Sequence, residues 1–250
     1  MTQRTTSAAR ARYGFDAPGI MLGLLFGGAT MVLLGWAVVA LTAGAARYLG
    51  MILMALGAIP LFFGLLMVLY AFAGKARTRD HILHLADLRD GDTVLDVGTG
   101  AGLLLVAAAK RNPRGTAIGI DLWSAKDLSN NAAATTLRNI AVEGVDDRAA
   151  VRTADARALP FPDAGFDRVL SLLCLHNIED ETDQRRACHE IARVLKPGGR
   201  IVIGDYVPTH RYAAAFADAG LHIVRSRPAF GIALSLMWIV VAERPADTRI

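Results

Sequence analysis

An acid and a glycine-rich turn carry the first chemistry that this sequence suggests. Asp96 precedes Gly98, Gly100 and Gly102, and the glycines lie between a short apolar run and an Ala/Leu-rich segment over 103–110. A buried strand, a glycine turn and a helix in this order leave backbone N–H groups at a helix N-terminus free to bind a ligand. Glycine suits such a turn because a Cβ would penalise its backbone angles and keep a ligand away from the backbone. The spacing differs from the G-x-G-x-x-G of dinucleotide-binding turns, which disfavours a nucleotide oxidoreductase.

A second acid follows at the distance that ribose recognition requires. The apolar run 117–121 ends in Asp121, which comes 19 positions after Gly102. An acid at the tip of the second strand of a βαβ unit is placed to bind ribose hydroxyls. The alternative is that Asp121 caps the next helix, and the two roles are compatible.

His176 and Asn177 are the candidate catalytic residues. They follow an apolar strand that begins at Phe166, and open parallel sheets bind their ligands at the carboxyl ends of strands. Histidine is suited to general base chemistry near neutral pH, and an asparagine amide can orient an acceptor oxygen. The alternative is that both residues cap the following acidic helix. Asp205 and Tyr206, at the end of the next strand, are weaker candidates for the acceptor site.

No metal centre is expected. His81 and His84 lie one helical turn apart, but no cysteine or carboxylate cluster accompanies them. The two cysteines, Cys174 and Cys188, do not make a disulfide framework, and Cys174 is expected to serve packing.

Alternating strands and helices must position these residues, and their pattern predicts an α/β sheet flanked by helices. Helices are expected over 80–90, 103–110, 130–139, 187–195 and 211–219, and strands over 93–97, 117–121, 150–155, from 166, 201–206, 221–226 and 237–243.

Three segments together resemble the class I S-adenosylmethionine (SAM)-dependent methyltransferases, in the group that contains the type 11 and quinone-biosynthesis enzymes. The D-x-G-x-G-x-G of 96–102 resembles motif I, the segment 155–162 resembles the family's D-a-x-x-L-P-F loop, and V-L-K-P-G-G-R-I-V-I occupies 194–203. The resemblance covers residues 80–245. It implies a Rossmann-like seven-stranded sheet whose last strand inserts antiparallel, with SAM as the cofactor.

The resemblance also assigns cofactor contacts. It implies that Trp123 lies beside the adenine and that the cofactor-binding residues are Asp96, Gly98, Thr99, Gly100, Gly102, Asp121, Leu122, Asp155, Ala156 and Leu172. Two departures weaken the transfer of a quinone substrate. The quinone group commonly has Arg-Asn where this chain has His176-Asn177, and the segment 207–220 is short for the usual inserted cap.

The N-terminal quarter predicts a membrane anchor. Residues 17–46 and 48–74 contain no charged side chain, and each stretch exceeds the roughly 20 apolar residues that cross a bilayer. The alternatives are a buried helical hairpin of a soluble protein and a cleaved signal peptide, whose apolar region is usually only about 7–15 residues long. The expected divisions are a cytoplasmic tail over 1–16, two transmembrane helices over 17–74, a linker and lid helix over 75–90, and the methyltransferase domain over 91–245.

Charge asymmetry predicts the orientation. Seven of the 27 Lys and Arg residues but only one of the 23 acids precede residue 80, and these bases flank the apolar stretches. The positive-inside rule then places both termini and the catalytic domain on the cytoplasmic side of the cell (inner) membrane. No nucleic-acid footprint is visible. The apolar segment 229–236 is expected to dip towards the membrane.

The sequence therefore predicts a membrane-anchored SAM-dependent methyltransferase with a small or lipophilic acceptor, and leaves the oligomeric state open. Two alternatives remain: a membrane-tethered SAM-binding scaffold without turnover, and a methyltransferase that acts on a protein or a polar metabolite.

Overall fold

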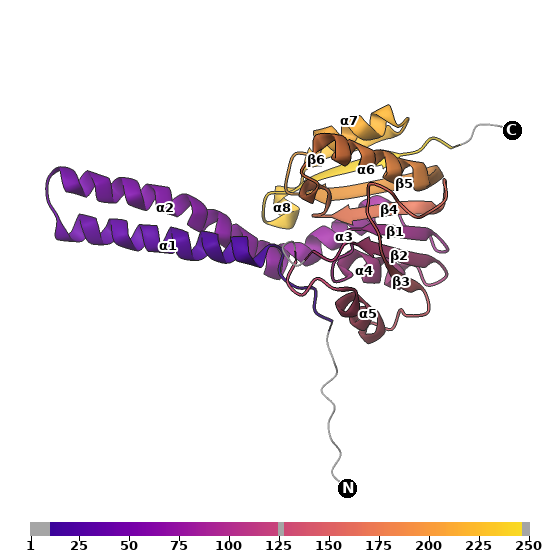
Figure 1. Cartoon of the computed structure of the whole chain (residues 1–250), viewed down its shortest axis with the longest axis horizontal. Helices are drawn as coiled ribbons and strands as arrows, with labels where there is room; N and C mark the ends of the chain where they lie inside the picture. Colours follow the sequence, from indigo (N-terminus) through magenta and orange to yellow (C-terminus); the bar gives the residue numbers. More distant parts are fainter. Residues whose placement is uncertain (1–10, 125–127, 247–250) are drawn as a thin grey trace, which may run out of the picture.

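A long helical hairpin projects from one side of an α/β domain (Figure 1). The structure is a computed structural model, and it describes residues 11–124 and 128–246. The hairpin consists of α1 (Pro18–Leu41) and α2 (Ala45–Leu69), which pack against each other along their length.

Glycines allow these two helices to approach closely. A Cβ added at Gly35 would lie 2.5 Å from the Gly50 carbonyl oxygen, and one added at Gly57 would lie 2.7 Å from the Met31 Cβ. By contrast, nothing lies within 4 Å of a Cβ added at Gly23. The small residues therefore form the contact between α1 and α2, as they do in membrane helix pairs.

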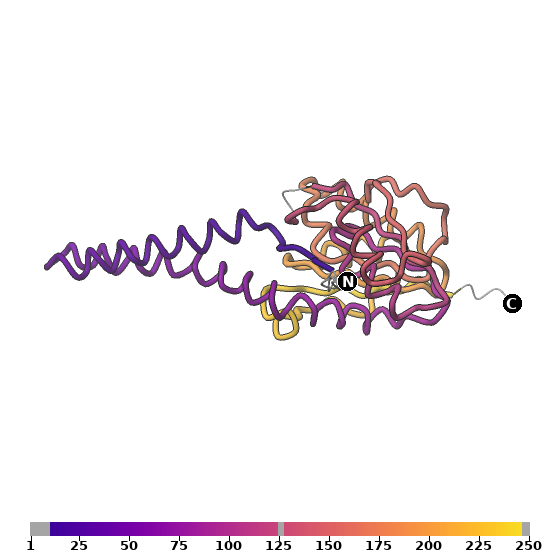
Figure 2. Tube along the Cα trace, turned by 90° about the horizontal axis from the view of Figure 1, so that it is seen from below, coloured from indigo at the N-terminus to yellow at the C-terminus, as the bar shows by residue number. Residues whose placement is uncertain are grey.

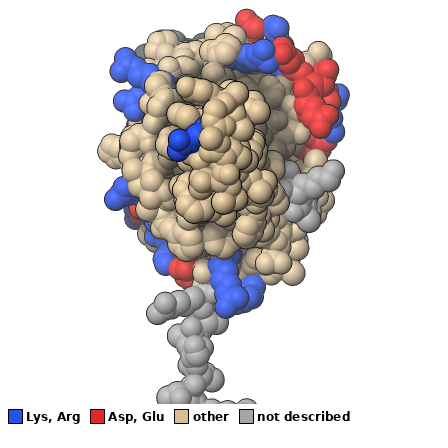
Figure 3. Space-filling view, turned by 90° about the vertical axis from the view of Figure 1, so that its left-hand side faces the viewer, with Lys and Arg blue, Asp and Glu red and all other residues tan. Residues whose placement is uncertain are grey.

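The outer surface of the hairpin is apolar and exposed. Phe26, Leu33 and Trp36 each expose more than half of their surface, and only 11% of the most apolar window of either helix is buried. Figure 3, which looks along the hairpin towards the domain, shows a shaft built almost wholly of uncharged residues. The hairpin is therefore not the buried core of a soluble domain, and both helices are long and apolar enough to cross a membrane.

The second hairpin helix continues into the domain without a break. After α2 the chain makes one π-helical turn, η1 (Tyr70–Gly74), and goes on as α3 (Lys75–Ala86). The helix expected over 80–90 thus begins earlier and ends at Ala86, because the following Asp87 has a left-handed φ of 50°. Gly74 is required because a Cβ there would lie 1.7 Å from the Ala233 carbonyl oxygen.

The short helix α8 (Phe230–Ala233) supplies that carbonyl. It packs against α3 and η1, so the apolar segment 229–236 lies at the base of the hairpin (Figure 2). Phe230 remains partly exposed there, and its ring packs edge-to-face on Trp238.

The sheet has the order β3-β2-β1-β4-β5-β7-β6, with β7 antiparallel to both of its neighbours. This confirms the predicted seven-stranded Rossmann-like sheet with an antiparallel last strand. The strands are β1 (Thr93–Val97), β2 (Thr116–Asp121), β3 (Ala149–Thr153), β4 (Phe166–Leu172), β5 (Leu195–Asp205), β6 (His222–Pro228) and β7 (Trp238–Glu243).

Helices cover both faces of the sheet, and each face has its own apolar core. One core contains residues of α6 (Glu181–Val194) and α7 (His210–Asp218), and the other contains residues of α3, α4 (Leu103–Arg111) and α5 (Ala133–Val142). Helix α6 begins six residues before the expected 187, because Asp180 caps it by accepting the Asp183 N–H at 3.0 Å.

Candidate active site

A cavity of about 510 Å³ lies at the carboxyl ends of β1, β2 and β4, on the side of the domain that meets the hairpin. The cofactor-binding and catalytic residues assigned from the sequence that line it are Asp96, Gly98, Thr99, Gly100, Asp121, Leu122, Asp155, Ala156, Leu172, His176 and Asn177. Gly102 and Trp123 do not line it, and Gly102 caps α4 with a φ of 86°. A Cβ at Gly102 would lie 2.8 Å from the Thr136 Cγ2, so this glycine allows the residue before α4 to approach Thr136 of α5.

The glycine turn has the backbone that its sequence predicts. Gly98 and Gly100 have φ values of 73° and 52°, which L-residues rarely adopt. A Cβ at Gly98 would lie 2.3 Å from the Cys174 Sγ. The atoms that exclude a side chain at Gly98 therefore belong to the protein itself, and Cys174 has the packing role expected of it.

The Asp96 side chain accepts hydrogen bonds from the glycine turn and from the start of α4. Its side chain is fully buried, and Oδ2 accepts the Thr99 hydroxyl at 2.8 Å and the Leu105 N–H at 3.0 Å. Burial raises the pKa of the Asp96 carboxyl to about 7, and these two hydrogen bonds oppose that rise. Asp96 therefore fixes the turn to the first residues of α4.

Asp121 is tied to the same turn from the next strand. Its Oδ2 accepts the Gly100 N–H at 2.8 Å, and its Oδ1 accepts the Trp123 N–H at 2.6 Å and the Asn131 amide at 3.2 Å. The residue that caps α5 is Ala132, so the structure does not show Asp121 as a helix cap. Asp121 is placed between the turn and Leu122, where the ribose of a bound nucleoside is expected.

The remaining residues assigned to the adenine differ in their surroundings. Leu122 is 61% exposed and lines the cavity. The Trp123 indole instead donates to the Thr153 hydroxyl at 2.7 Å. The Asp155 carboxylate forms an ion pair with Arg157 at 2.7 Å, and hydrogen bonds from Arg157 lower the pKa of Asp155. Its assignment to the adenine ring stays a prediction.

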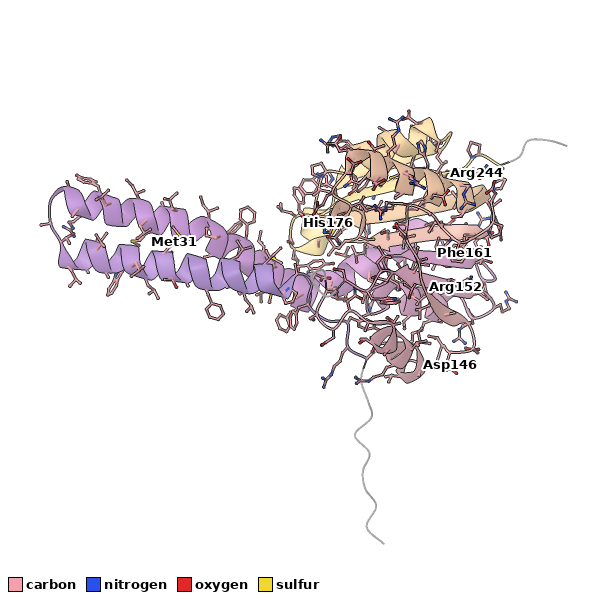
Figure 4. All side chains as sticks on the ribbon, in the orientation of Figure 1. Met31, Asp146, Arg152, Phe161, His176 and Arg244 are labelled. Atoms are coloured by element: carbon pink, nitrogen blue, oxygen red, sulfur yellow. The ribbon has the colours of Figure 1, made fainter. Side chains whose placement is uncertain are left out.

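His176 and Asp205 form a hydrogen-bonded pair at the end of β4 and β5. His176 Nδ1 lies 2.6 Å from Asp205 Oδ1, and the His176 N–H donates to Asp205 Oδ2 at 3.1 Å. Asp205 is fully buried and also accepts the Tyr212 hydroxyl at 3.2 Å, while Tyr206 packs edge-to-face on the His176 ring. Figure 4 shows His176 on the side of the domain that faces the hairpin. The sequence placed the two residues at neighbouring strand ends, but it did not predict that they are paired.

Three cavity residues come from the chain next to the hairpin, and no sequence pattern assigned them to the site. Tyr13 and Asp16 precede α1, and Lys75 begins α3. Burial and the nearby Glu143 carboxylate raise the pKa of Tyr13 to about 12, so its hydroxyl stays protonated. These positions could be found only by knowing that both ends of the hairpin return to the sheet edge.

Acids dominate the cavity wall. Its described residues include Asp16, Asp96, Asp121, Asp155 and Glu179, but only one Lys or Arg, which is Lys75. Such a wall favours a cationic ligand over a pyrophosphate. Asn131 also lines the cavity, and its buried Oδ1 has no hydrogen-bond partner within the described chain. The N–H groups of Gly98, Thr99, Gly100 and Gly102 already donate within the protein, so the turn does not offer the free donors expected from its sequence. The acids of the wall, with Asp121 at the ribose position, and this orphaned acceptor fit an adenosyl sulfonium.

No group of His, Cys, Asp and Glu side chains suited to a metal ion occurs within residues 11–124 and 128–246. His81 and His84 both lie on α3.

Comparison with known families agrees with this geometry. Residues 95–203 match the family described as "Methyltransferase domain". The chain is 35% identical over 144 residues to 27-O-demethylrifamycin SV methyltransferase of Amycolatopsis mediterranei, covering 57% of this chain and 49% of that protein. It is 32% identical over 146 residues to demethylmenaquinone methyltransferase of Thermus thermophilus, covering 58% of this chain and 61% of that protein. The chain thus spans about half the length of the curated relatives it matches.

Solved structures share the fold. The 4+2 cyclase SpnF aligns with a TM-score of 0.57 at 21% identity, over 68% of this chain and 82% of that one. Geranyl diphosphate C-methyltransferase of Streptomyces coelicolor aligns with a TM-score of 0.54 at 17% identity, over 68% of this chain and 80% of that one. Residues 95–203 thus match a methyltransferase domain, whose cofactor is S-adenosylmethionine, and the curated proteins that the chain resembles over this region are named methyltransferases.

Proposed function

We propose that this protein is an active methyltransferase that methylates a hydroxyl group of a small, lipophilic acceptor at the cytoplasmic face of the membrane. The observation that carries the proposal is the pair His176–Asp205, which stands at the cofactor cavity with a 2.6 Å hydrogen bond. A cofactor-binding scaffold without turnover has no need of a histidine that a buried carboxylate orients.

The pair supplies a general base. S-adenosylmethionine, when bound, supplies a methyl group on an electrophilic sulfonium. An acceptor hydroxyl gains this methyl on its oxygen, the bond from methyl to sulfur breaks, and S-adenosylhomocysteine is the product. The hydroxyl proton must leave, and His176 is placed to accept it. Asp205 fixes the ring by taking the Nδ1–H, which leaves Nε2 as the acceptor for the proton.

Other residues in the cavity assist without exchanging protons. Asn177 is exposed beside His176 and carries an amide suited to orienting the acceptor oxygen. Asp96 and Asp121 hold the glycine turn, so its N–H groups keep their positions when the cofactor enters. Positioning of this kind is the main contribution an enzyme makes to an in-line displacement.

The hairpin supports a lipophilic acceptor. Its two helices are apolar and exposed, and both lead to the edge of the sheet where the cavity lies. A compound dissolved in the bilayer would therefore be concentrated next to His176. Two of the curated relatives are named for a rifamycin and for demethylmenaquinone. The exchange of Arg-Asn for His176-Asn177 favours an acceptor hydroxyl over the quinone of that second group.

Orientation follows from the flanking charges. Lys75, Arg77 and Arg79 begin the helix that enters the domain, and Figure 3 shows further basic groups around the base of the hairpin. The positive-inside rule then puts the domain in the cytoplasm. Location in the cell (inner) membrane is part of the proposal.

The proposal is tested with the full chain in lipid nanodiscs. Methyl-labelled SAM is incubated with membrane lipid extract or with a panel of phenolic and hydroxylated lipids, and S-adenosylhomocysteine and labelled products are measured. We expect label in the organic phase as a methyl ether, and we expect His176→Ala to abolish its formation while cofactor binding persists. Label confined to proteins or to the aqueous phase would contradict the lipophilic acceptor. Binding of SAM without transfer to any fraction would favour the scaffold.

A further inference from the structure

The chain that precedes the hairpin lies across the cofactor cavity. We call residues 11–17 the strap. The Arg12 backbone exchanges two hydrogen bonds with the Asn139 side chain, at 3.0 and 2.8 Å. The Phe15 N–H donates to the Ser129 hydroxyl at 2.8 Å, and Asp16 forms an isolated bridge with Leu128. The strap is therefore bonded to α5 and to the segment before it.

Lys75 fastens the strap to the other end of the hairpin. Its Nζ lies 3.0 Å from the Tyr13 carbonyl oxygen, 3.1 Å from that of Gly14 and 3.0 Å from Asp16 Oδ2. Lys75 is only 8% exposed, although it is the first residue of α3. Both ends of the hairpin thus meet at one partly buried ion pair in the wall of the cavity, in which the Lys75 and Asp16 side chains are 11% and 25% exposed.

This partly buried ion pair brings a cation into a wall that otherwise carries acids. Asp16 Oδ2 is buried and has the ion pair with Lys75 but no aligned hydrogen bond in the described chain. Lys75 is the sole Lys or Arg among the described cavity residues. Removing two charges from water is costly unless both find further partners. Lys75 has further partners in the Tyr13 and Gly14 carbonyls, whereas Asp16 Oδ2 has only the ion pair, so the pair places one incompletely satisfied anion beside the one described cation of the wall.

The cofactor has the charges that match this pair. Besides its sulfonium, SAM carries an α-carboxylate and an α-ammonium at the end opposite the adenine. Asp121, at the end of β2, marks the ribose side of the glycine turn. Helix α3, which begins with Lys75, packs against β4 and β5 on the other side of β1. Asp16 and Lys75 line the same cavity as the turn, where the amino-acid end of the cofactor requires opposite charges.

We infer that Asp16 and Lys75 form the subsite for the amino-acid end of SAM, Lys75 binding its carboxylate and Asp16 its ammonium. This inference rests on the cofactor of the proposed function. Each charge of the pair then exchanges its protein partner for an opposite charge of the ligand, so no buried charge is left alone. The two ends of the hairpin thereby complete the cofactor site, and the hairpin is more than an anchor.

The test compares two ligands that differ only at this end. S-adenosylhomocysteine carries the amino-acid group, whereas 5′-methylthioadenosine has a methyl group in its place. Their dissociation constants are measured by calorimetry on the full chain in nanodiscs, for the wild type and for Lys75→Met and Asp16→Asn. Arg77→Met, which changes an exposed cation two positions further along α3, serves as the control. Thermal unfolding confirms that each variant folds.

We expect Lys75→Met and Asp16→Asn each to weaken S-adenosylhomocysteine binding by about tenfold or more, the usual effect of losing a charge-assisted hydrogen bond. The affinity for 5′-methylthioadenosine should not change, and Arg77→Met should match the wild type for both ligands. An equal loss for the two ligands would show that the pair only holds the strap, and unchanged affinity would show that it does not contact the cofactor. Either result overturns the inference. If the wild type binds neither ligand, the proposed function fails as well.

Discussion

Gly98 gives the sharpest steric prediction, because two atoms of one neighbouring residue exclude a side chain there. A Cβ at Gly98 would lie 2.3 Å from Cys174 Sγ and 2.4 Å from Cys174 Cβ, while Cys174 Cα is 3.6 Å away. Gly98 also has a φ of 73°. Gly98→Ala should therefore be destabilised by two separate causes, the backbone conformation and the collision with Cys174.

Their sizes can be stated separately. A left-handed backbone costs an L-residue roughly 1–2 kcal/mol. Overpacking of a close contact costs typically about 1–3 kcal/mol. Cys174→Gly removes both colliding atoms and leaves an ordinary contact with Cα, whereas Cys174→Ala leaves the Cβ at 2.4 Å. The penalty of Gly98→Ala should thus fall by about 1–3 kcal/mol in the Cys174→Gly background, and it should persist in the Cys174→Ala background.

The assay is a double-mutant cycle on the full chain in detergent or nanodiscs, with thermal unfolding of the domain and S-adenosylhomocysteine affinity as readouts. For a domain of this size, each kcal/mol corresponds to roughly 2–4 °C in Tm. Gly98→Ala should lower both Tm and affinity, and Cys174→Gly should restore part of each. An equal penalty of Gly98→Ala in all three backgrounds would refute the steric reasoning.

Three further predictions concern other parts of the molecule. Asp205→Asn should lower the rate of methyl transfer by roughly 100-fold or more, because the His176 ring loses the partner that fixes its tautomer. The affinity for S-adenosylhomocysteine should not change. A loss of affinity without a loss of rate would assign Asp205 to cofactor binding. Burial raises the pKa of Asp96 to about 7, above its value of about 4 in the unfolded chain, so the folded state retains this proton and the free energy of unfolding falls as pH rises from about 4 to about 7. Asp96→Asn should flatten the dependence of Tm on pH between about pH 4 and 8. The same dependence in the variant and the wild type would contradict this prediction. Gly57→Leu should separate α1 from α2 and increase proteolysis of the hairpin, since a Cβ there meets Met31 at 2.7 Å, whereas Gly23→Leu, with nothing within 4 Å, should behave as the wild type.

Short sequence patterns predicted the parts of the site whose residues lie close together in the chain. Asp96, the glycines and the start of α4 lie within a few positions of one another, so their spacing alone indicated a strand, a turn and a helix. The seven-stranded Rossmann-like sheet with an antiparallel last strand followed from the resemblance of the later segments to one family. The order of the strands comes from the structure.

Contacts between distant segments could not be predicted in this way. Lys75 and the Tyr13 carbonyl are 62 positions apart, and His176 and Asp205 are 29 positions apart. Neither pair has a spacing that marks it, because each exists only when the sheet and the hairpin bring their elements together. The sequence also suggested that Gly98 lacks a Cβ so that a ligand can approach the backbone. The structure shows instead that Cys174 occupies the space that a Cβ at Gly98 would take. The roles of the individual site residues stay predictions that the experiments above decide.

Equilibrium binding decides whether the cavity beside the hairpin is a SAM site. Calorimetric titration of the full chain in nanodiscs with SAM, S-adenosylhomocysteine and NAD should give micromolar binding of the first two and none of NAD, and Asp121→Ala should abolish it. Failure of the folded protein to bind either adenosyl ligand, or tighter binding of NAD, would contradict the account.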